Sequence, residues 1–133
     1  SEILEREQVT LWNSVPALMQ MLLEYGAGRC GMLPDSLRLV LLSGDWLPLS
    51  LPDRLKQFIP AVQVVSLGGA TEASIWSILY PIVSVDPAWK SIPYGQPMQN
   101  QQFYVLDEQL EPRPIWVPGQ LYIAGVGLAQ GYW

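Results

Sequence analysis

The sequence contains no histidine and only one cysteine, Cys30, among its 133 residues. Histidine and cysteine are the main protein ligands of zinc, and histidine is the base of a serine hydrolase triad. Their scarcity excludes a zinc site, a histidine-based triad and a disulfide within the chain. A lone cysteine also suits a reducing compartment, so we expect a cytoplasmic protein. Its chemistry must use carboxylates, hydroxyls, backbone groups or a bound nucleotide.

Charged residues and long apolar runs are also scarce. Charged residues make up 14% of the chain, the net charge is −5 and there is no basic run, which argues against a nucleic-acid partner. No apolar stretch approaches the roughly 20 residues that a membrane-spanning helix needs, so we expect no membrane partner. Hydrophobic residues make up 50% of the chain, which is enough for a substantial core and argues against disorder.

The first two thirds of the chain alternate between strand and helix patterns. Apolar runs predict strands over residues 9–12, 37–42, 62–66 and 75–83, and helical spacing predicts helices over 16–25 and 51–59. Ser50 is the predicted N-cap of the second helix, and residues 27–36 form a predicted loop. This order implies a parallel sheet with right-handed crossovers. The predicted fold class is therefore α/β, with a parallel sheet and flanking helices over about residues 9–83.

The last third has a different pattern. A connection rich in proline and glycine over residues 84–100 leads to two short predicted strands, 103–107 and 120–124. They indicate part of a small β subdomain over about residues 92–133. Six tryptophans and the high apolar fraction suit a piece whose surface other segments would cover. We therefore expect residues 1–133 to be one partial domain, truncated at both ends.

A glycine-rich stretch follows the predicted strand 62–66. Gly68 and Gly69 allow the backbone to approach a ligand closely. Backbone N–H groups in such a loop, together with the Thr71 hydroxyl, can donate hydrogen bonds to phosphate oxygens. Glu72 offers the hard oxygen ligand that Mg²⁺ prefers. The alternative is an ordinary turn between a strand and a loop.

Several motifs in the same order resemble those of the adenylation domains of nonribosomal peptide synthetases, members of the adenylate-forming superfamily. The run Gly69-Ala70-Thr71-Glu72 resembles Y-G-P-T-E, residues 92–97 with 104–107 resemble I-G-x-P and Y-V-L-D, and residues 119–132 resemble G-E-L-x-I-x-G-x-G-x-A-R-G-Y. The run Ser43-Gly44-Asp45 stands where the family has G-G-E. The motifs cover most of the chain, and they place it in the large N-terminal domain of the superfamily's fold.

This resemblance implies an activity and its cofactors. The family makes an aminoacyl-adenylate from an amino acid and MgATP, then loads the acyl group onto the phosphopantetheine thiol of a carrier domain. By position, Thr71 would contact the phosphates and Glu72 would hold Mg²⁺, which makes these two the expected catalytic residues. The residues expected at the nucleotide are Gly44, Asp45, Gly68, Gly69, Ala70 and Thr71.

The chain departs from the family pattern in places. Gly68 stands where the family usually has a tyrosine that stacks on adenine, so that stacking is lost or supplied elsewhere. Gln120 and Gln130 replace the usual glutamate and arginine of the last motif. The phosphate loop with its lysine, the ribose-binding aspartate and the catalytic lysine of the C-terminal domain are absent. We therefore expect no adenylation by the chain alone.

Positions that correlate with the amino-acid substrate in this family can also be aligned. They are Asn13, Leu41, Ser43, Leu67, Ile75 and Trp76. This set resembles the pocket of cysteine-activating domains, which often stand beside heterocyclisation domains, so L-cysteine is the predicted substrate and a heterocyclisation or condensation domain a predicted partner. A thiol tolerates the apolar lining better than a hydroxyl does. Serine or a small aliphatic acid stays open, because such pockets discriminate only about 10–200-fold.

Two other functions remain open. One is an acyl- or aryl-CoA ligase of the same superfamily, and the other is a non-catalytic module that binds a nucleotide or a partner. The strand positions Leu41, Leu67 and Ile75 could also be ordinary core residues.

Overall fold

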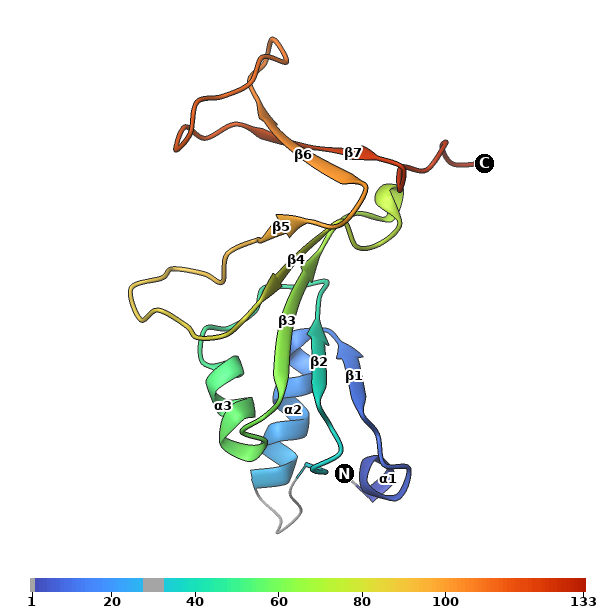
Figure 1. Ribbon diagram of the computed structural model, residues 1–133, viewed down its shortest axis with the longest axis vertical. Helices are drawn as coiled ribbons and strands as arrows, with labels where there is room; N and C mark the ends of the chain where they lie inside the picture. The colour runs from blue at the N-terminus through green and yellow to red at the C-terminus, as the bar shows by residue number, and fades with distance from the viewer. Residues whose placement is uncertain (1, 28–32) are drawn as a thin grey trace. The chain divides into compact units, whose positions relative to one another are not determined.

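The computed structural model describes residues 2–27 and 33–133 (Figure 1). The chain divides into two compact units, one made of Ser1–Leu67 with Tyr80–Gly95 and the other of Gly68–Leu79 with Gln96–Trp133. Cys30 and half of the loop predicted over 27–36 lie outside the described residues. Within the described part of the chain, no helix combines the length and hydrophobicity that crossing a bilayer requires.

The first unit contains a parallel sheet with helices between its strands. Its elements are α1 (Glu2–Arg6), β1 (Leu11–Ser14), α2 (Pro16–Ala27), β2 (Leu39–Leu42), α3 (Leu51–Phe58) and β3 (Gln63–Gly68), whose last residue belongs to the second unit. Strands β1, β2 and β3 are neighbours and parallel, with Leu11 paired to Leu39 and Leu39 paired to Gln63. The predicted strand–helix–strand–helix–strand order is confirmed, and with it the α/β fold class.

The core of the first unit follows from the spacing of its apolar residues. Met19 and Leu23 are four residues apart on α2, as are Leu51 and Leu55 on α3, so each pair lies on one face of its helix. All four side chains are buried, with Val40 and Leu42 of β2 and Val64 of β3 beside them in the same cluster. Burial of each such side chain contributes about 1.5–3 kcal/mol relative to exposure.

Several element boundaries differ from the prediction. A turn that follows α1, in which the Val9 N–H donates to the Leu4 carbonyl at 3.0 Å, occupies the start of the predicted strand 9–12, so β1 begins at Leu11. The predicted capping role of Ser50 is wrong. Ser50 has helical dihedrals, φ −77° and ψ −16°, and its side chain makes no capping hydrogen bond.

The second unit is built from antiparallel strands. It contains a 3₁₀ turn at Thr71–Ala73, the first half of β4 (Ile78–Pro81), β5 (Gln96–Pro97), β6 (Gln101–Leu106) and β7 (Gln120–Gly125). Ile78 pairs with Pro97, and β6 pairs with β7 along its whole length. The two short strands predicted near the C-terminal end of the sequence are confirmed, and the structure shows that they pair in antiparallel fashion.

The limits of the two predicted parts need correction. Residues 68–79 belong to the second unit, although the parallel sheet was predicted to extend to about residue 83. The predicted strand 75–83 starts only at Ile78, because Ser74 and Ile75 have positive φ angles of 59° and 71° that interrupt extended backbone. Strand β5 lies inside the predicted connection 84–100.

Candidate functional site

The glycine-rich stretch forms a turn that closes on itself. The N–H groups of Ala73 and Ile75 both donate to the Ala70 carbonyl, at 2.9 Å and 3.1 Å. The Ser77 N–H donates to the Gly68 carbonyl at 2.8 Å and ties the end of the turn to its start. Ser77 is fully buried, and its hydroxyl donates to the Ala73 carbonyl at 3.0 Å. These bonds hold the turn that carries Thr71 and Glu72.

Only glycine fits at position 69 of this turn. Gly69 has a φ angle of +154°, and a Cβ placed on it would lie 2.4 Å from the Ile75 carbonyl oxygen and 3.0 Å from the Trp76 Cα atom. The turn therefore brings three predicted site residues, Gly69, Ile75 and Trp76, into contact. The close approach that this glycine permits is between two stretches of the chain's own backbone.

Glu72 is held from two directions by the segment that follows β7. Its carboxylate oxygen Oε1 accepts a hydrogen bond of 2.7 Å from the hydroxyl of Tyr132. Its main-chain carbonyl accepts a bond of 2.7 Å from the Ala129 N–H. Nearby, the Ser74 hydroxyl donates to the Gly127 carbonyl at 2.7 Å. An exposed carboxylate is thus fixed by partners more than fifty residues away in the sequence.

The bond to Tyr132 also shifts the pKa of Glu72. Donation from the phenol, more than any other contact, lowers the pKa of Glu72 below its usual value, and the same bond raises the pKa of Tyr132. The bond therefore favours the ionised carboxylate and the protonated phenol, the forms that both groups have at neutral pH. An exposed, ionised and oriented carboxylate is suited to binding a cation.

The donor set around Glu72 determines which cation fits. The described residues contain no group of three or more His, Cys, Asp or Glu side chains that could hold a metal ion. A metal bound by protein side chains alone is therefore not supported there. Mg²⁺ fits, because it binds through one or two carboxylates and completes its coordination with water and substrate phosphates.

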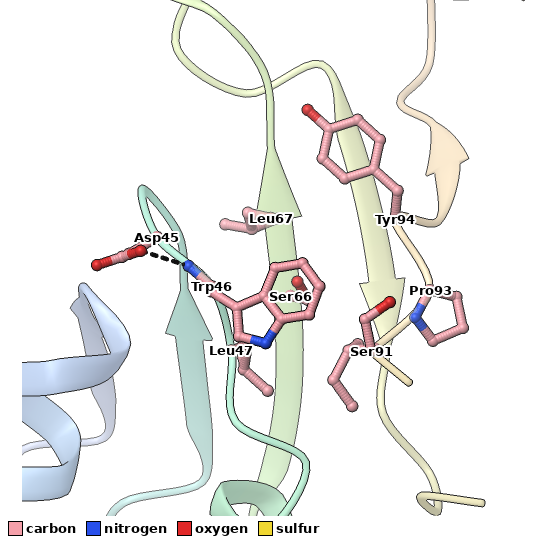
Figure 2. Close-up of a pocket in the computed structure, with 9 residues that line it drawn as sticks. Asp45, Trp46, Leu47, Ser66, Leu67, Ser91, Pro93 and Tyr94 are labelled. Atoms are coloured by element: carbon pink, nitrogen blue, oxygen red, sulfur yellow. Dashed lines mark hydrogen bonds between the residues drawn. The ribbon is translucent and has the colours of Figure 1, made fainter. Parts of the chain in front are cut away.

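A pocket of about 410 Å³ lies in the first unit (Figure 2). It is lined by Asp45, Trp46, Leu47, Ser66, Leu67, Ser91, Ile92, Pro93 and Tyr94. In Figure 2 the loop that carries Trp46 lies on one side, and the segment that carries Ser91 and Tyr94 lies on the other. The lining combines two aromatic rings, apolar side chains and two serine hydroxyls, which suits a planar ligand with polar edges.

Asp45 and Trp46 sit on a turn directly after β2. The preceding Gly44 has a φ angle of +82°, which glycine adopts without strain. The Asp45 carboxylate accepts a bond of 2.7 Å from the Trp46 N–H, which fixes its orientation at the edge of the pocket. The Trp46 side chain is 67% exposed, so its ring is available to a ligand.

The structure places four of the predicted substrate residues at the carboxyl ends of adjacent parallel strands. Asn13 of β1 pairs with Leu41 of β2, and the Ser43 N–H donates to the Ser14 carbonyl just beyond both strands, at 3.2 Å. Leu67 lies near the end of β3, is buried, and lines the same pocket as Asp45. Ligands of open α/β sheets bind at this edge.

The remaining predicted residues lie in the second unit. Ile75 and Trp76 belong there with Gly68, Gly69, Ala70, Thr71 and Glu72. Ile75 is 66% exposed and has a positive φ angle, so it is not the core strand residue of the alternative interpretation. The predicted cavity of Leu41, Leu67, Ile75 and Trp76 stays a prediction.

Sequence reasoning assigned no role to several residues that the structure places at these sites. Trp46 and Ser66 line the pocket, and Tyr132 contacts Glu72. Tyr132 was recognisable as the end of the motif at residues 119–132, but its spacing of 60 residues from Glu72 carries no sign of the contact. Trp46 follows Asp45 directly, and a tryptophan shortly after a predicted strand end was the available signal.

Comparison with known proteins identifies the family. The model of the AMP-binding enzyme family matches residues 1–133. The chain belongs to the AMP-binding enzymes. Among these, it matches adenylation domains of nonribosomal peptide synthetases, which confirms the predicted resemblance.

Two of the relatives are named as a synthase and a synthetase. Bacitracin synthase 1 of Bacillus licheniformis is 51% identical over 136 residues, which cover 98% of this chain and 2% of that protein. Pyochelin synthetase PchE of Pseudomonas aeruginosa is 46% identical over 133 residues, which cover 99% of this chain and 9% of that protein. The chain thus spans a small part of the length of the AMP-binding relatives that it matches.

A solved structure confirms the fold. The nonribosomal peptide synthetase FmoA3 matches with a TM-score of 0.95 and 46% identity over 98% of this chain and 14% of that chain. A second FmoA3 structure, with a TM-score of 0.94 and 46% identity over 98% of this chain and 15% of that chain, is the α-methyl-L-serine-AMP bound form. The AMP-binding chain described here therefore has the fold of part of an adenylation domain.

Proposed function

We propose that this chain is the central part of a longer adenylation domain, which activates an amino acid as aminoacyl-AMP with MgATP. The proposal rests mainly on the geometry at Glu72, whose exposed and ionised carboxylate is held at the turn by a hydrogen bond from Tyr132. In the proposed reaction the amino-acid carboxylate attacks the α-phosphorus of ATP, a new P–O bond forms, and pyrophosphate leaves. Negative charge must be neutralised as the reactants meet, which is the main demand on the site.

Thr71 and Glu72 are the proposed catalytic residues. Mg²⁺, when bound, would neutralise phosphate charge and orient the α-phosphate for attack. Glu72 would supply its protein carboxylate ligand, and the Thr71 hydroxyl would donate to a phosphate oxygen. Gly68, Gly69 and Ala70 lead into this turn and would lie beside the phosphates, although the close approach that Gly69 permits is to the chain's own backbone.

The pocket in the first unit is our proposed site for the nucleotide base. Gly44 and Asp45, the predicted nucleotide residues of this unit, lie on the turn at its edge, and its volume of about 410 Å³ suits a small ligand. With Gly68 in place of the usual tyrosine, stacking on the base is lost or comes from another residue. Trp46 is exposed beside the pocket and is our candidate for stacking on the base.

L-cysteine is our proposed substrate. Support comes from the identities of the residues at the strand ends, where Leu41 and Leu67 are apolar and Asn13 and Ser43 are polar. A thiol makes only weak hydrogen bonds and tolerates such surroundings. The α-methyl-L-serine-AMP bound form of FmoA3 favours a second candidate, a serine-like amino acid, because FmoA3 is 46% identical to this chain.

The proposed partners follow from the same assignment. The activated acyl group would pass to the phosphopantetheine thiol of a carrier domain, and a heterocyclisation or condensation domain would use the product in making a secondary metabolite. The names of bacitracin synthase 1 and pyochelin synthetase PchE support a role in such a synthetase. A cytoplasmic setting is proposed from the single cysteine in the sequence.

Amino-acid-dependent ATP–pyrophosphate exchange tests the proposal. The assay uses the full adenylation domain that carries this chain and compares cysteine with serine, alanine and valine. We expect exchange that is selective for cysteine and that collapses in Glu72→Ala but survives in Glu108→Ala, a control at another exposed carboxylate of the second unit. Selective exchange with serine would overturn the cysteine assignment alone. A folded domain that exchanges with no amino acid would overturn the proposed activity and favour a CoA ligase or a non-catalytic module.

A further inference from the structure

The segment after β7 binds the turn that carries Glu72. Its contacts are those from Tyr132 to the Glu72 carboxylate, from Ala129 to the Glu72 carbonyl, and from Ser74 to the Gly127 carbonyl, each 2.7 Å long. We call residues 125–132 the clamp segment. Its bonds reach both the main chain and the side chain of Glu72, so they fix the position of the residue and the direction of its carboxylate.

Glycines shape the clamp segment. Gly125 has a φ angle of +123°, and a Cβ there would lie 2.2 Å from the Asn100 carbonyl oxygen. The Val126 N–H donates to that same oxygen at 3.1 Å, so the chain turns sharply where β7 ends. The Leu128 N–H then donates to the Gly125 carbonyl at 3.4 Å. This sharp turn directs residues 127–132 back to the turn that carries Glu72.

The bond from Tyr132 leaves Glu72 able to bind a cation. A carboxylate has two oxygens and about four acceptor positions, and Tyr132 uses one position on Oε1. Hydrogen bonds to a ligating carboxylate orient it and are typically needed for full metal affinity. The phenol thus acts on Glu72 without competing for the whole carboxylate.

We propose that Tyr132 is a positioning residue that holds the Glu72 carboxylate in the direction needed to bind Mg²⁺ together with the nucleotide. This inference rests on the proposed function, because it assumes that Glu72 is the ligand. Ser74 and Ala129 hold the main chain of the same turn, so they act on its position and Tyr132 acts on the side chain. Tyr132 itself contacts neither substrate nor metal in this role.

The test compares Tyr132→Phe with Tyr104→Phe in the full adenylation domain that carries this chain. Tyr104 is the matched control, because its exposed phenol also donates a bond of 2.7 Å to a side-chain oxygen, that of Gln102. The first readout is calorimetric binding of a non-hydrolysable ATP analogue at increasing Mg²⁺ concentrations. We expect Tyr132→Phe to raise the Mg²⁺ concentration for half-maximal binding about tenfold, and Tyr104→Phe to leave it unchanged.

The second readout is hydrogen exchange at the amides that close the turn, those of Ala73, Ile75 and Ser77. Loss of the phenol should leave their exchange near the wild-type rate, because Ala129 and Ser74 still hold the main chain. Excess Mg²⁺ should then restore nucleotide binding in Tyr132→Phe. The inference would be overturned if these amides exchanged rapidly in Tyr132→Phe and excess Mg²⁺ did not restore nucleotide binding. That result would show that Tyr132 has a merely structural role.

Glu72→Ala separates failure of this inference from failure of the proposed function. If Glu72→Ala changes the Mg²⁺ dependence and Tyr132→Phe does not, only the positioning role is overturned. If Glu72→Ala leaves the Mg²⁺ dependence unchanged, the metal-binding role of Glu72 fails and the inference fails with it.

Discussion

Tyr132 donates a hydrogen bond of 2.7 Å to the Glu72 carboxylate across 60 residues of sequence. The two residues stand in different motifs, one at the end of the glycine-rich turn and the other at the end of residues 119–132. Their contact joins these motifs into one structure within the second unit. It also lowers the pKa of Glu72 and raises that of Tyr132, because it favours the ionised carboxylate and the protonated phenol.

This contact predicts a pH dependence of stability in the Mg²⁺-free domain. The pKa of Glu72 is depressed in the folded state, so its contribution is complete above the usual glutamate pKa of 4.5 and is lost as the pH falls through the lower folded pKa. For Tyr132, whose folded pKa is raised, the contribution is complete below the usual pKa of 10.0 and is lost as the pH rises through the folded value.

Urea unfolding of the wild-type domain and of Tyr132→Phe measures this effect. The measurements cover pH 3–11, about eight units, which spans the usual pKa values of glutamate and tyrosine. The wild type should have a larger free energy of unfolding than the variant near neutral pH, and this difference should disappear at both the acidic and the alkaline end of the range. A difference that is constant over the whole range would show that the hydrogen bond does not couple the two ionisations. Site-resolved NMR titration of labelled glutamate provides an independent check on the direction for Glu72.

Gly69→Ala should destabilise the turn that carries Glu72. A Cβ at this position would lie 2.4 Å from the Ile75 carbonyl oxygen, so backbone must move. Gly131→Ala is the matched control, since Gly131 also has a positive φ angle, +147°, but a Cβ there would meet nothing within 4 Å. Overpacking typically lowers the free energy of unfolding by about 1–3 kcal/mol. Urea unfolding should therefore show that Gly69→Ala loses about that much more stability than Gly131→Ala. Equal losses for the two variants would contradict the predicted clash.

Met19→Ala should destabilise the first unit strongly. Met19 is fully buried in the core between helices and sheet, and such truncations cost about 2–5 kcal/mol through lost contacts and a residual cavity. Its neighbour Leu18 is 51% exposed on the same helix, so Leu18→Ala should cost no more than about 0.5 kcal/mol. Chemical denaturation gives both values, and similar losses for the two variants would show that α2 does not pack by this face.

Trp46→Ala should weaken binding of ATP. If the ring stacks on the base, its removal costs about 1–3 kcal/mol of binding free energy, as base–aromatic stacking does elsewhere. Trp116→Ala serves as the control, because Trp116 is 98% exposed and lies in the other unit. Calorimetric titration with ATP measures both affinities. Unchanged affinity in a folded Trp46→Ala domain would remove Trp46 from the nucleotide site.

Local sequence patterns were sufficient for most helices and strands. Apolar spacing in α2 and α3 repeats every four residues, and the apolar runs of β2 and β3 are short and continuous, so each element could be predicted from its own residues. The same kind of pattern predicted the two strands β6 and β7, but not their antiparallel pairing. The motifs at residues 69–72 and 119–132 were sufficient for the family, because their joint spacing is specific.

The sequence by itself therefore determined the fold class, the family and the candidate roles of Thr71 and Glu72, all of which depend on short-range patterns or motif order. Only the tertiary structure decided which unit residues 68–79 join, where Ser74 and Ile75 interrupt the strand, and which residue holds Glu72. These features depend on hydrogen bonds and close contacts between distant segments. Such contacts depend on how the whole chain packs. The types of the two residues in contact, and of their neighbours in the sequence, do not specify them.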